Sequence, residues 1–145
     1  MRKIIYTQPD GGIAVVHPVR NTYPTLETLS DAEIEQRAWD RLPPEAINPQ
    51  WVDESAIPTD RTFRNAWKAG SGKIEHDMAK CREMTKERLR AERAPLLAAQ
   101  DVAFQRALES NSSTSAIVAE KQRLRDVTKL VKDSMTLDEL KALKV

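Results

Sequence analysis

The residues that bend or interrupt secondary structure are concentrated in one half of this chain. Seven of its eight prolines, all four glycines, all three tryptophans and both tyrosines precede residue 76. Glycine and proline mark turns and short strands, whereas a stretch without them favours long helices. The distribution therefore predicts an α+β protein, with a small β-hairpin and helix domain over residues 1–76 and a long α-helical hairpin with a short terminal helix over residues 77–145.

The first domain begins with two β-prone segments. Residues 3–7 and 13–16 are rich in isoleucine and valine, and a Gln-Pro-Asp-Gly-Gly sequence separates them. Proline fixes one backbone angle, aspartate bonds its own backbone, and glycine accepts a positive φ, so these residues suit a tight reversal. The pattern predicts a β-hairpin followed by a loop over residues 17–24.

A helix is expected after this loop. Ser30 and Glu33 have the spacing of a capping box, in which each side chain accepts a hydrogen bond from the backbone amide of the other residue. The box predicts a helix over residues 31–41. Apolar residues recur at every fourth position from Ile34, so one face of this helix should cover the hairpin.

The rest of the first domain contains three short extended segments. Residues around Trp51 lie between prolines, which is typical of an edge strand because proline donates no hydrogen bond to a neighbouring strand. Residues 62–68 and 73–75 flank an Ala-Gly-Ser-Gly sequence, which predicts a second hairpin. The three tryptophans are expected to form the core of the domain, with a ligand platform as the alternative.

The second half is predicted to be helical. Residues 77–109 contain no glycine and few β-branched residues, and Asp77 is placed to cap the first turn. Pro95 interrupts this stretch, and because a proline inside a helix costs about 3 kcal/mol, a kink or a restart is expected there. A Ser-Asn-Ser-Ser sequence at residues 110–113 predicts the turn to a second helix.

Apolar side chains form a stripe along each of the two long helices. The stripes are expected to face each other and to extend beyond what the small first domain can cover. Thr136 and Glu139 have the spacing of a second capping box, which predicts a last short helix over residues 137–143. The two long helices therefore either fold back with this last helix or pack against other chains. The predicted protein-binding surface consists of Leu89, Leu96, Leu97, Phe104, Leu108, Ile117, Leu124 and Val131.

Few side chains could carry out catalysis or hold a metal. Cys81, His76 and His17 are the only cysteine and histidines of the sequence, too few for a four-ligand zinc site. Cys81 and His76 would lie on different faces of a helix, so a nucleophile and base pair is not expected. The Gly-Ser-Gly-Lys sequence at residues 70–73 lacks the other residues of a phosphate loop, and a hairpin turn explains it. We expect neither enzyme activity nor a cofactor.

The charge balance argues against two classes of partner. Lys and Arg number 23 against 22 Asp and Glu, which gives no overall field to attract nucleic acid or an anionic membrane. Acidic and basic residues alternate over residues 80–93, which indicates a solvated helix face, with a protein or nucleic-acid contact as the alternative. No apolar run approaches the roughly 20 residues of a membrane span. The lone cysteine fits synthesis in a reducing cytoplasm.

Several segments resemble small proteins encoded by tailed bacteriophages and prophages. They are residues 4–12 (IIYTQPDGG), 57–67 (IPTDRTFRNAW), 77–80 (DMAK), 90–97 (RAERAPLL) and 121–128 (KQRLRDVT). The second half is also similar in layout to the C-terminal region of phage tail assembly chaperones and fibre-associated proteins. The resemblance implies a non-catalytic role in a virion or its assembly, among other phage structural proteins, after synthesis in the host bacterial cytoplasm.

Three functions remain open on this basis. The chain is expected to be a virion component of the tail, baseplate or fibre-attachment region, repeated by the symmetry of the particle as a homo-oligomer or a symmetric assembly. As an assembly chaperone it would instead bind tail subunits and be absent from finished particles. As a host-directed or nucleic-acid-binding accessory protein it would use the arginines of residues 82–93.

Overall fold

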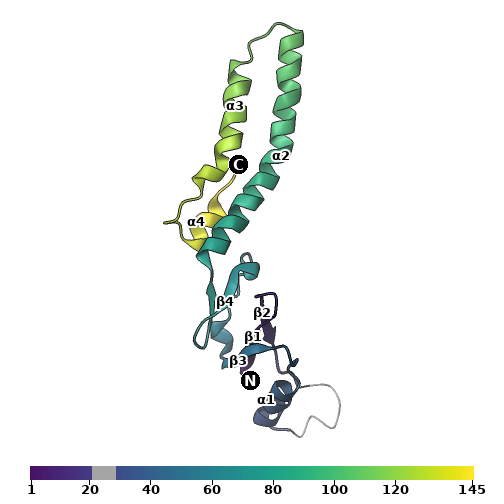
Figure 1. Cartoon of the computed structure of the whole chain (residues 1–145), viewed down its shortest axis with the longest axis vertical. Helices are drawn as coiled ribbons and strands as arrows, with labels where there is room; N and C mark the ends of the chain where they lie inside the picture. Colours follow the sequence, from purple (N-terminus) through teal and green to yellow (C-terminus); the bar gives the residue numbers. More distant parts are fainter. Residues whose placement is uncertain (21–28) are drawn as a thin grey trace. The chain divides into compact units, whose positions relative to one another are not determined.

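The computed structural model describes residues 1–20 and 29–145 and confirms a mixed α+β fold (Figure 1). The chain divides into two compact units, Met1–Asp77 and Met78–Val145. The described strands all lie in the first unit and the long helices lie in the second. Each unit is described below by itself.

The first unit is built on a three-stranded antiparallel sheet. Strand β1 (Lys3–Thr7) is central, and β2 (Ile13–Val16) and β3 (Ile47–Val52) pair with its two edges. The predicted hairpin and the predicted edge strand are both confirmed. In the β1–β2 turn Gly11 has a φ of 84°, which a residue with a side chain rarely adopts, so glycine is required there.

The strand register defines the two faces of this sheet. Ile4 lies opposite Val16 on β2 and Trp51 on β3, whereas Ile5 lies opposite Val15 and Gln50. Directly opposed residues of antiparallel strands point to the same face, and successive residues point to opposite faces. Ile4 and Ile5 are both fully buried, so both faces of the sheet are covered.

A second hairpin packs on the face that carries Ile5. Its strands are β4 (Trp67–Ala69) and β5 (Ile74–His76), and two 3₁₀ turns precede it, η2 (Glu54–Ala56) and η3 (Arg64–Ala66). The shared core consists of Ile5, Ile13, Val52, Trp67 and Ile74. The predicted hairpin is confirmed, but its first strand begins later than residue 62 because residues 64–66 form the 3₁₀ turn.

The β3 strand and the second hairpin are also joined by one polar side chain. The Gln50 side chain donates a hydrogen bond to the Gly70 carbonyl and accepts one from the Gly72 amide, both at 3.0 Å. Lys73 forms an ion pair with Glu75 at 3.2 Å, and Gly70 donates to the Lys73 carbonyl. The Gly-Ser-Gly-Lys sequence is therefore a hairpin turn, as predicted.

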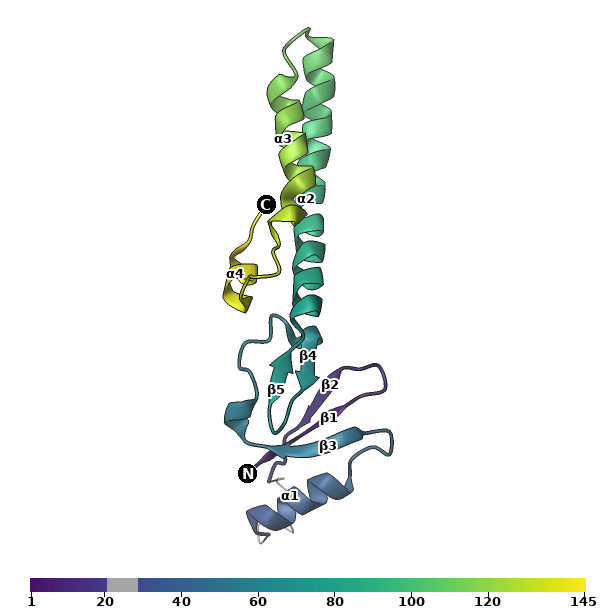
Figure 2. The same ribbon diagram turned by 60° about the vertical axis from the view of Figure 1, so that its left-hand side comes forward.

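Helix α1 (Asp31–Asp40) covers the other face of the sheet and lies beside β3 (Figure 2). Both hydrogen bonds of the predicted capping box between Ser30 and Glu33 are present. The Arg2 guanidinium forms two hydrogen bonds to Glu35 on the helix, which fixes the start of the chain against α1. Of the loop predicted over residues 17–24, residues 17–20 have neither helix nor strand, and residues 21–24 lie outside the described residues.

The tryptophans do not form one core. Trp67 is buried between the sheet and the second hairpin, as predicted. Trp39 and Trp51 are half-buried and stack on each other across α1 and β3, with ring centroids 5.1 Å apart. The prediction was therefore wrong for these two, which remain partly exposed, and the Arg2 guanidinium lies over the Trp51 ring.

The second unit is a helical hairpin with a short terminal helix. Helix α2 (Met78–Glu109) and helix α3 (Ser115–Asp126) run side by side in both views (Figures 1 and 2). A 3₁₀ turn, η4 (Val127–Leu130), leads to α4 (Leu137–Ala142), whose predicted capping box is present. No helix in the part of the chain that the structure describes is long and apolar enough to cross a membrane.

Helix α2 continues through Pro95. Of the two outcomes expected at Pro95, a kink or a restart, the restart does not occur, because the helix has no break between Met78 and Glu109. A proline removes one backbone hydrogen bond and crowds the carbonyl four residues earlier, which bends a helix without ending it. The ribbon of α2 changes direction partway along its length (Figure 1).

Candidate protein-binding surface

The base of the helical unit has a core made from four elements, α2, α3, η4 and α4. Cys81, Thr85 and Leu89 recur at every fourth residue of α2 and are almost wholly buried. This face packs against α3, η4 and α4, which contribute the buried side chains of Leu124, Val127 and Leu140. The last helix thus closes the base of the hairpin.

Two arginines of α2 tie the other elements to this base. Arg88 donates to the carbonyls of Leu140 and Leu143, at 3.1 and 2.9 Å. Arg93 donates to the carbonyls of Leu124 and Arg125 at the end of α3. The last carbonyls of a helix lack partners within it and carry partial negative charge, so a guanidinium suits both places.

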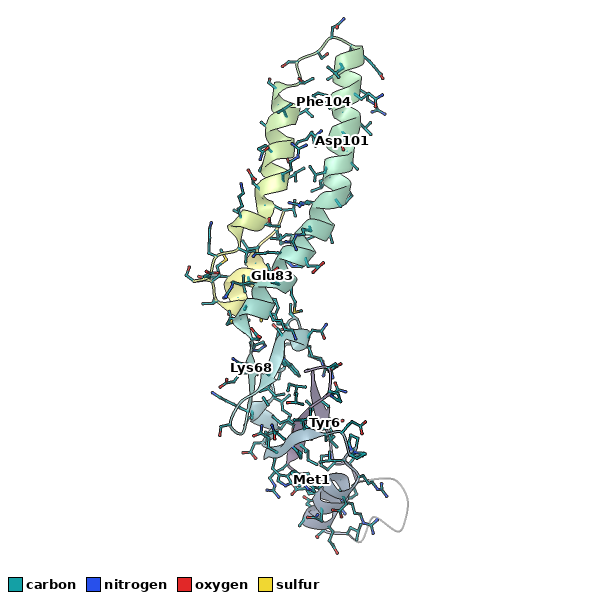
Figure 3. The ribbon with its side chains drawn as sticks, viewed as in Figure 1. Met1, Tyr6, Lys68, Glu83, Asp101 and Phe104 are labelled. Carbon is teal, nitrogen blue, oxygen red and sulfur yellow. The ribbon has the colours of Figure 1, made fainter. Side chains whose placement is uncertain are left out.

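Beyond this base the hairpin consists of α2 and α3 alone. Lys121 on α3 forms an ion pair with Asp101 on α2 at 2.5 Å, and its ammonium group lies 5.3 Å from the centre of the Phe104 ring. Figure 3 labels Asp101 and Phe104 on this half of α2. Among the described residues of this half, Ala107 is the one buried apolar side chain. The contact between α2 and α3 in this half therefore buries little apolar surface.

The eight residues predicted to bind a partner fall into different environments. Leu89 and Leu124 are buried to 0 % and 1 % exposure, so they belong to the core of the base and are not available to a partner. Leu96 and Leu108 are exposed at 45 % and 56 %. The other four are half-buried: Leu97, Phe104, Ile117 and Val131.

Val131 is also separated from the rest of the predicted surface. It follows η4, in the segment that leads to α4, and its amide donates to the Thr128 carbonyl. Sequence periodicity extended the α3 stripe to this residue, but the helix ends at Asp126. Val131 therefore lies at the base of the hairpin and not on its outer half.

Three of the remaining predicted residues lie on one side of the outer half. Leu97, Phe104 and Leu108 are spaced by seven and four residues, so they share one side of α2. Val118 is three residues before Lys121 on α3, and Lys121 contacts Phe104, so Val118 faces the same side. We call this surface the tip flank and define it as Leu97, Phe104, Leu108 and Val118.

The tertiary roles of two basic residues in α2 could not be predicted from the sequence. The predicted pairs within the helix are present, with Lys86 bonded to Glu83 and Arg88 to Glu92. The Lys86 hydrogen bond also lowers the pKa of Glu83. Arg88 and Arg93 additionally bond carbonyls far away in the sequence, so they are not a simple solvated face.

Cys81 and His76, the two residues considered for catalysis, lie in structural positions. Cys81 is buried in α2. His76 lies in β5, where it accepts a hydrogen bond from the Trp67 indole. Within residues 1–20 and 29–145, no group of three His, Cys, Asp or Glu side chains has the arrangement of a metal site.

Comparison with known proteins adds nothing to this geometry, because no family model, curated protein or solved structure matches the chain. The chemistry of the described surfaces is the remaining guide to function. On the helical unit, the tip flank is an apolar strip beside the ion pair of Asp101 and Lys121. Such a strip suits contact with another protein.

Proposed function

We propose that this chain is a non-catalytic structural adaptor of a tailed-phage particle, placed in the tail, baseplate or fibre-attachment region, and that the tip flank is its attachment to a neighbouring protein. The phage setting rests on the resemblance of its sequence segments. The observation that carries the binding role is the exposed apolar strip on a hairpin whose outer half has only two helices.

Two packed helices cannot cover an apolar strip that runs along the side of their seam. Leu108 is 56 % exposed and Val118 is 49 % exposed, although both lie on well-formed helices. Burial of apolar surface contributes about 25 cal/mol for each Å² removed from water, so a partner that covers this strip gains free energy. A helix or sheet face of a neighbouring virion protein would supply that cover.

The Lys121–Asp101 ion pair beside the tip flank is compatible with burial in an interface. Lys121 and Asp101 already neutralise each other, and the Lys121 side chain is only 17 % exposed. Burying an unpaired charge is costly, whereas a pair that is formed before binding leaves no charge without a partner. The Lys121 ammonium group also contacts the Phe104 ring, so the ion pair lies against one residue of the tip flank.

The test is the protein composition of purified phage particles. Mass spectrometry should find the chain in particles, in a fixed ratio to a known tail protein. Particles assembled with L108D and V118D together should lack the chain, because charges on the strip oppose burial. A matched control is V102D, which changes an equally exposed valine on another side of α2.

Two results would contradict the proposal. If the wild-type chain is absent from particles but copurifies with unassembled tail subunits, it is an assembly chaperone. If V102D excludes the chain as completely as L108D with V118D, the tip flank is not the attachment. Circular dichroism of each variant shows that the helices are retained.

A further inference from the structure

A separate cavity lies in the first unit, between α1 and the end of β2. Its volume is about 260 Å³. Most of the lining is apolar, and two of the lining residues, Pro18 and Ile34, are buried. The other apolar lining residues are Val16, Val19, Ala38, Leu42 and Pro43. The three remaining lining residues carry nitrogen in their side chains: His17, Arg37 and Arg41.

Arg37 and Arg41 lie one turn apart on α1 and are exposed. The carboxylates of the same helix are engaged elsewhere. Glu33 bonds Ser30, Glu35 bonds Arg2, and Asp40 accepts from Gln36. Asp31 is paired with Arg20. Among the residues that the structure describes, neither Arg37 nor Arg41 has a hydrogen-bonded carboxylate partner.

The shape and charge of this cavity define what would bind to it. Guanidinium groups bind carboxylates with paired, charge-assisted hydrogen bonds. The cavity is smaller than the roughly 300–1,000 Å³ of pockets that enclose a small-molecule ligand, so it suits a single apolar side chain. We propose that it is a docking site for an acidic segment of a partner protein, with an apolar side chain in the cavity and adjacent carboxylates on Arg37 and Arg41.

This site goes beyond the attachment proposed above. It lies in the first unit, whereas the tip flank lies in the second, and neither site uses residues of the other. A chain with both would hold two different partners, as an adaptor must. Failure of one site would leave the other intact, so the two proposals are tested separately.

The binding test uses the full chain and a short synthetic peptide in which a leucine is flanked by glutamates. Fluorescence anisotropy of the labelled peptide should show saturable binding. Two matched peptides separate the two contributions: one has serine in place of the leucine, and one has glutamines in place of the glutamates. Both should bind at least about tenfold more weakly, because one lacks the anchor and the other lacks the charge-assisted bonds.

Variants of the chain locate the site. R37Q with R41Q should weaken binding of the leucine and glutamate peptide about tenfold, since two charge-assisted contacts at an exposed rim are lost. A38F should weaken it as strongly by filling the cavity while both arginines remain. The control is R64Q with K68Q, which removes the same charge from exposed residues of the same unit, outside the cavity, and should leave binding unchanged.

Three results would overturn this proposal. The first is no binding of the leucine and glutamate peptide to the wild-type chain at about 1 mM, the weakest affinity expected of a specific site. The second is an equal loss of binding in the control variant, which would show general attraction of acidic peptides. The third is unaltered binding to A38F, which would show that the cavity is not used.

Discussion

The indole N–H of Trp67 donates a hydrogen bond to Nε2 of His76 at 3.2 Å. The two residues lie directly opposite each other at one end of the β4–β5 hairpin. Trp67 is buried in the core of the first unit, so its polar N–H needs a partner inside the protein. Nε2 of the histidine supplies this acceptor.

Removal of this acceptor should destabilise the first unit. H76A leaves the buried indole N–H without a partner, so the free energy of unfolding should fall by about 1–3 kcal/mol. Chemical denaturation followed by tryptophan fluorescence measures the loss. H76A combined with W67F should cost little more than W67F alone, because the N–H is then absent. A full additive loss in the double variant would contradict the role given to the bond.

Acid should weaken the contact between the start of the chain and α1. Hydrogen bonds from the side chain and the backbone of Arg2 lower the pKa of Glu35. Because the pKa is lower in the folded state, the bond's contribution to stability is complete above about pH 4.3, the ordinary pKa of Glu, and declines as the pH falls towards the lowered value. E35Q should be less stable than the wild type at pH 7, and the difference should shrink below pH 4. A difference that is constant with pH would contradict this assignment.

Loss of Arg88 should weaken the attachment of α4 and the residues after it to α2. Its guanidinium holds the carbonyls of Leu140 and Leu143, and it is about one-third exposed, so R88A should cost about 1 kcal/mol. Hydrogen exchange of the α4 amides should become faster, while amides in the middle of α3 remain unchanged. R90A is the control, since Arg90 is an exposed arginine of the same helix. Equal acceleration in R90A would remove the special role of Arg88.

Leu124 and Leu108 should respond differently to truncation. Leu124 is buried in the base, so L124A should lower the free energy of unfolding by about 2–5 kcal/mol. Leu108 is more than half exposed, so L108A should change it by less than about 0.5 kcal/mol in the free chain. Thermal unfolding followed by circular dichroism at 222 nm compares the two. A similar loss in both variants would mean that Leu108 is covered in solution.

Replacement of Pro95 should stabilise the helical unit. Proline inside a helix is less favourable than alanine by about 3 kcal/mol, and α2 continues through this position. P95A should therefore raise the melting temperature of the helices. A lower melting temperature would show that the bend at Pro95 is needed for α2 to pack on its neighbours.

Features with a local cause could be predicted from the sequence. The capping boxes at Ser30 and Thr136 depend on residues three positions apart, and both are present. The first hairpin was also predicted with its observed strands, because its turn residues determine the backbone path locally.

Features that depend on distant parts of the chain could not be predicted. A leucine stripe has the same spacing whether it is buried or exposed, so Leu89 and Leu108 were placed in one surface although only Leu108 is accessible. The bonds of Arg88 join residues more than fifty positions apart. The cavity beside α1 was missed for the same reason, since Val16 and Ile34 meet only after the sheet and the helix have packed.

Helix α2 makes more tertiary contacts in its first half than in its last turns, and this difference determines which end of the hairpin opens first. Its first half is held by α3, η4 and α4 and by two arginines, whereas its last turns are held by α3 alone across a seam with one ion pair. Thermal fluctuations should therefore separate the helices first at the Ser110 turn and progress towards Leu89. A partner that binds the outer half would suppress this fraying. Its binding would therefore reduce the motion of the whole helical hairpin.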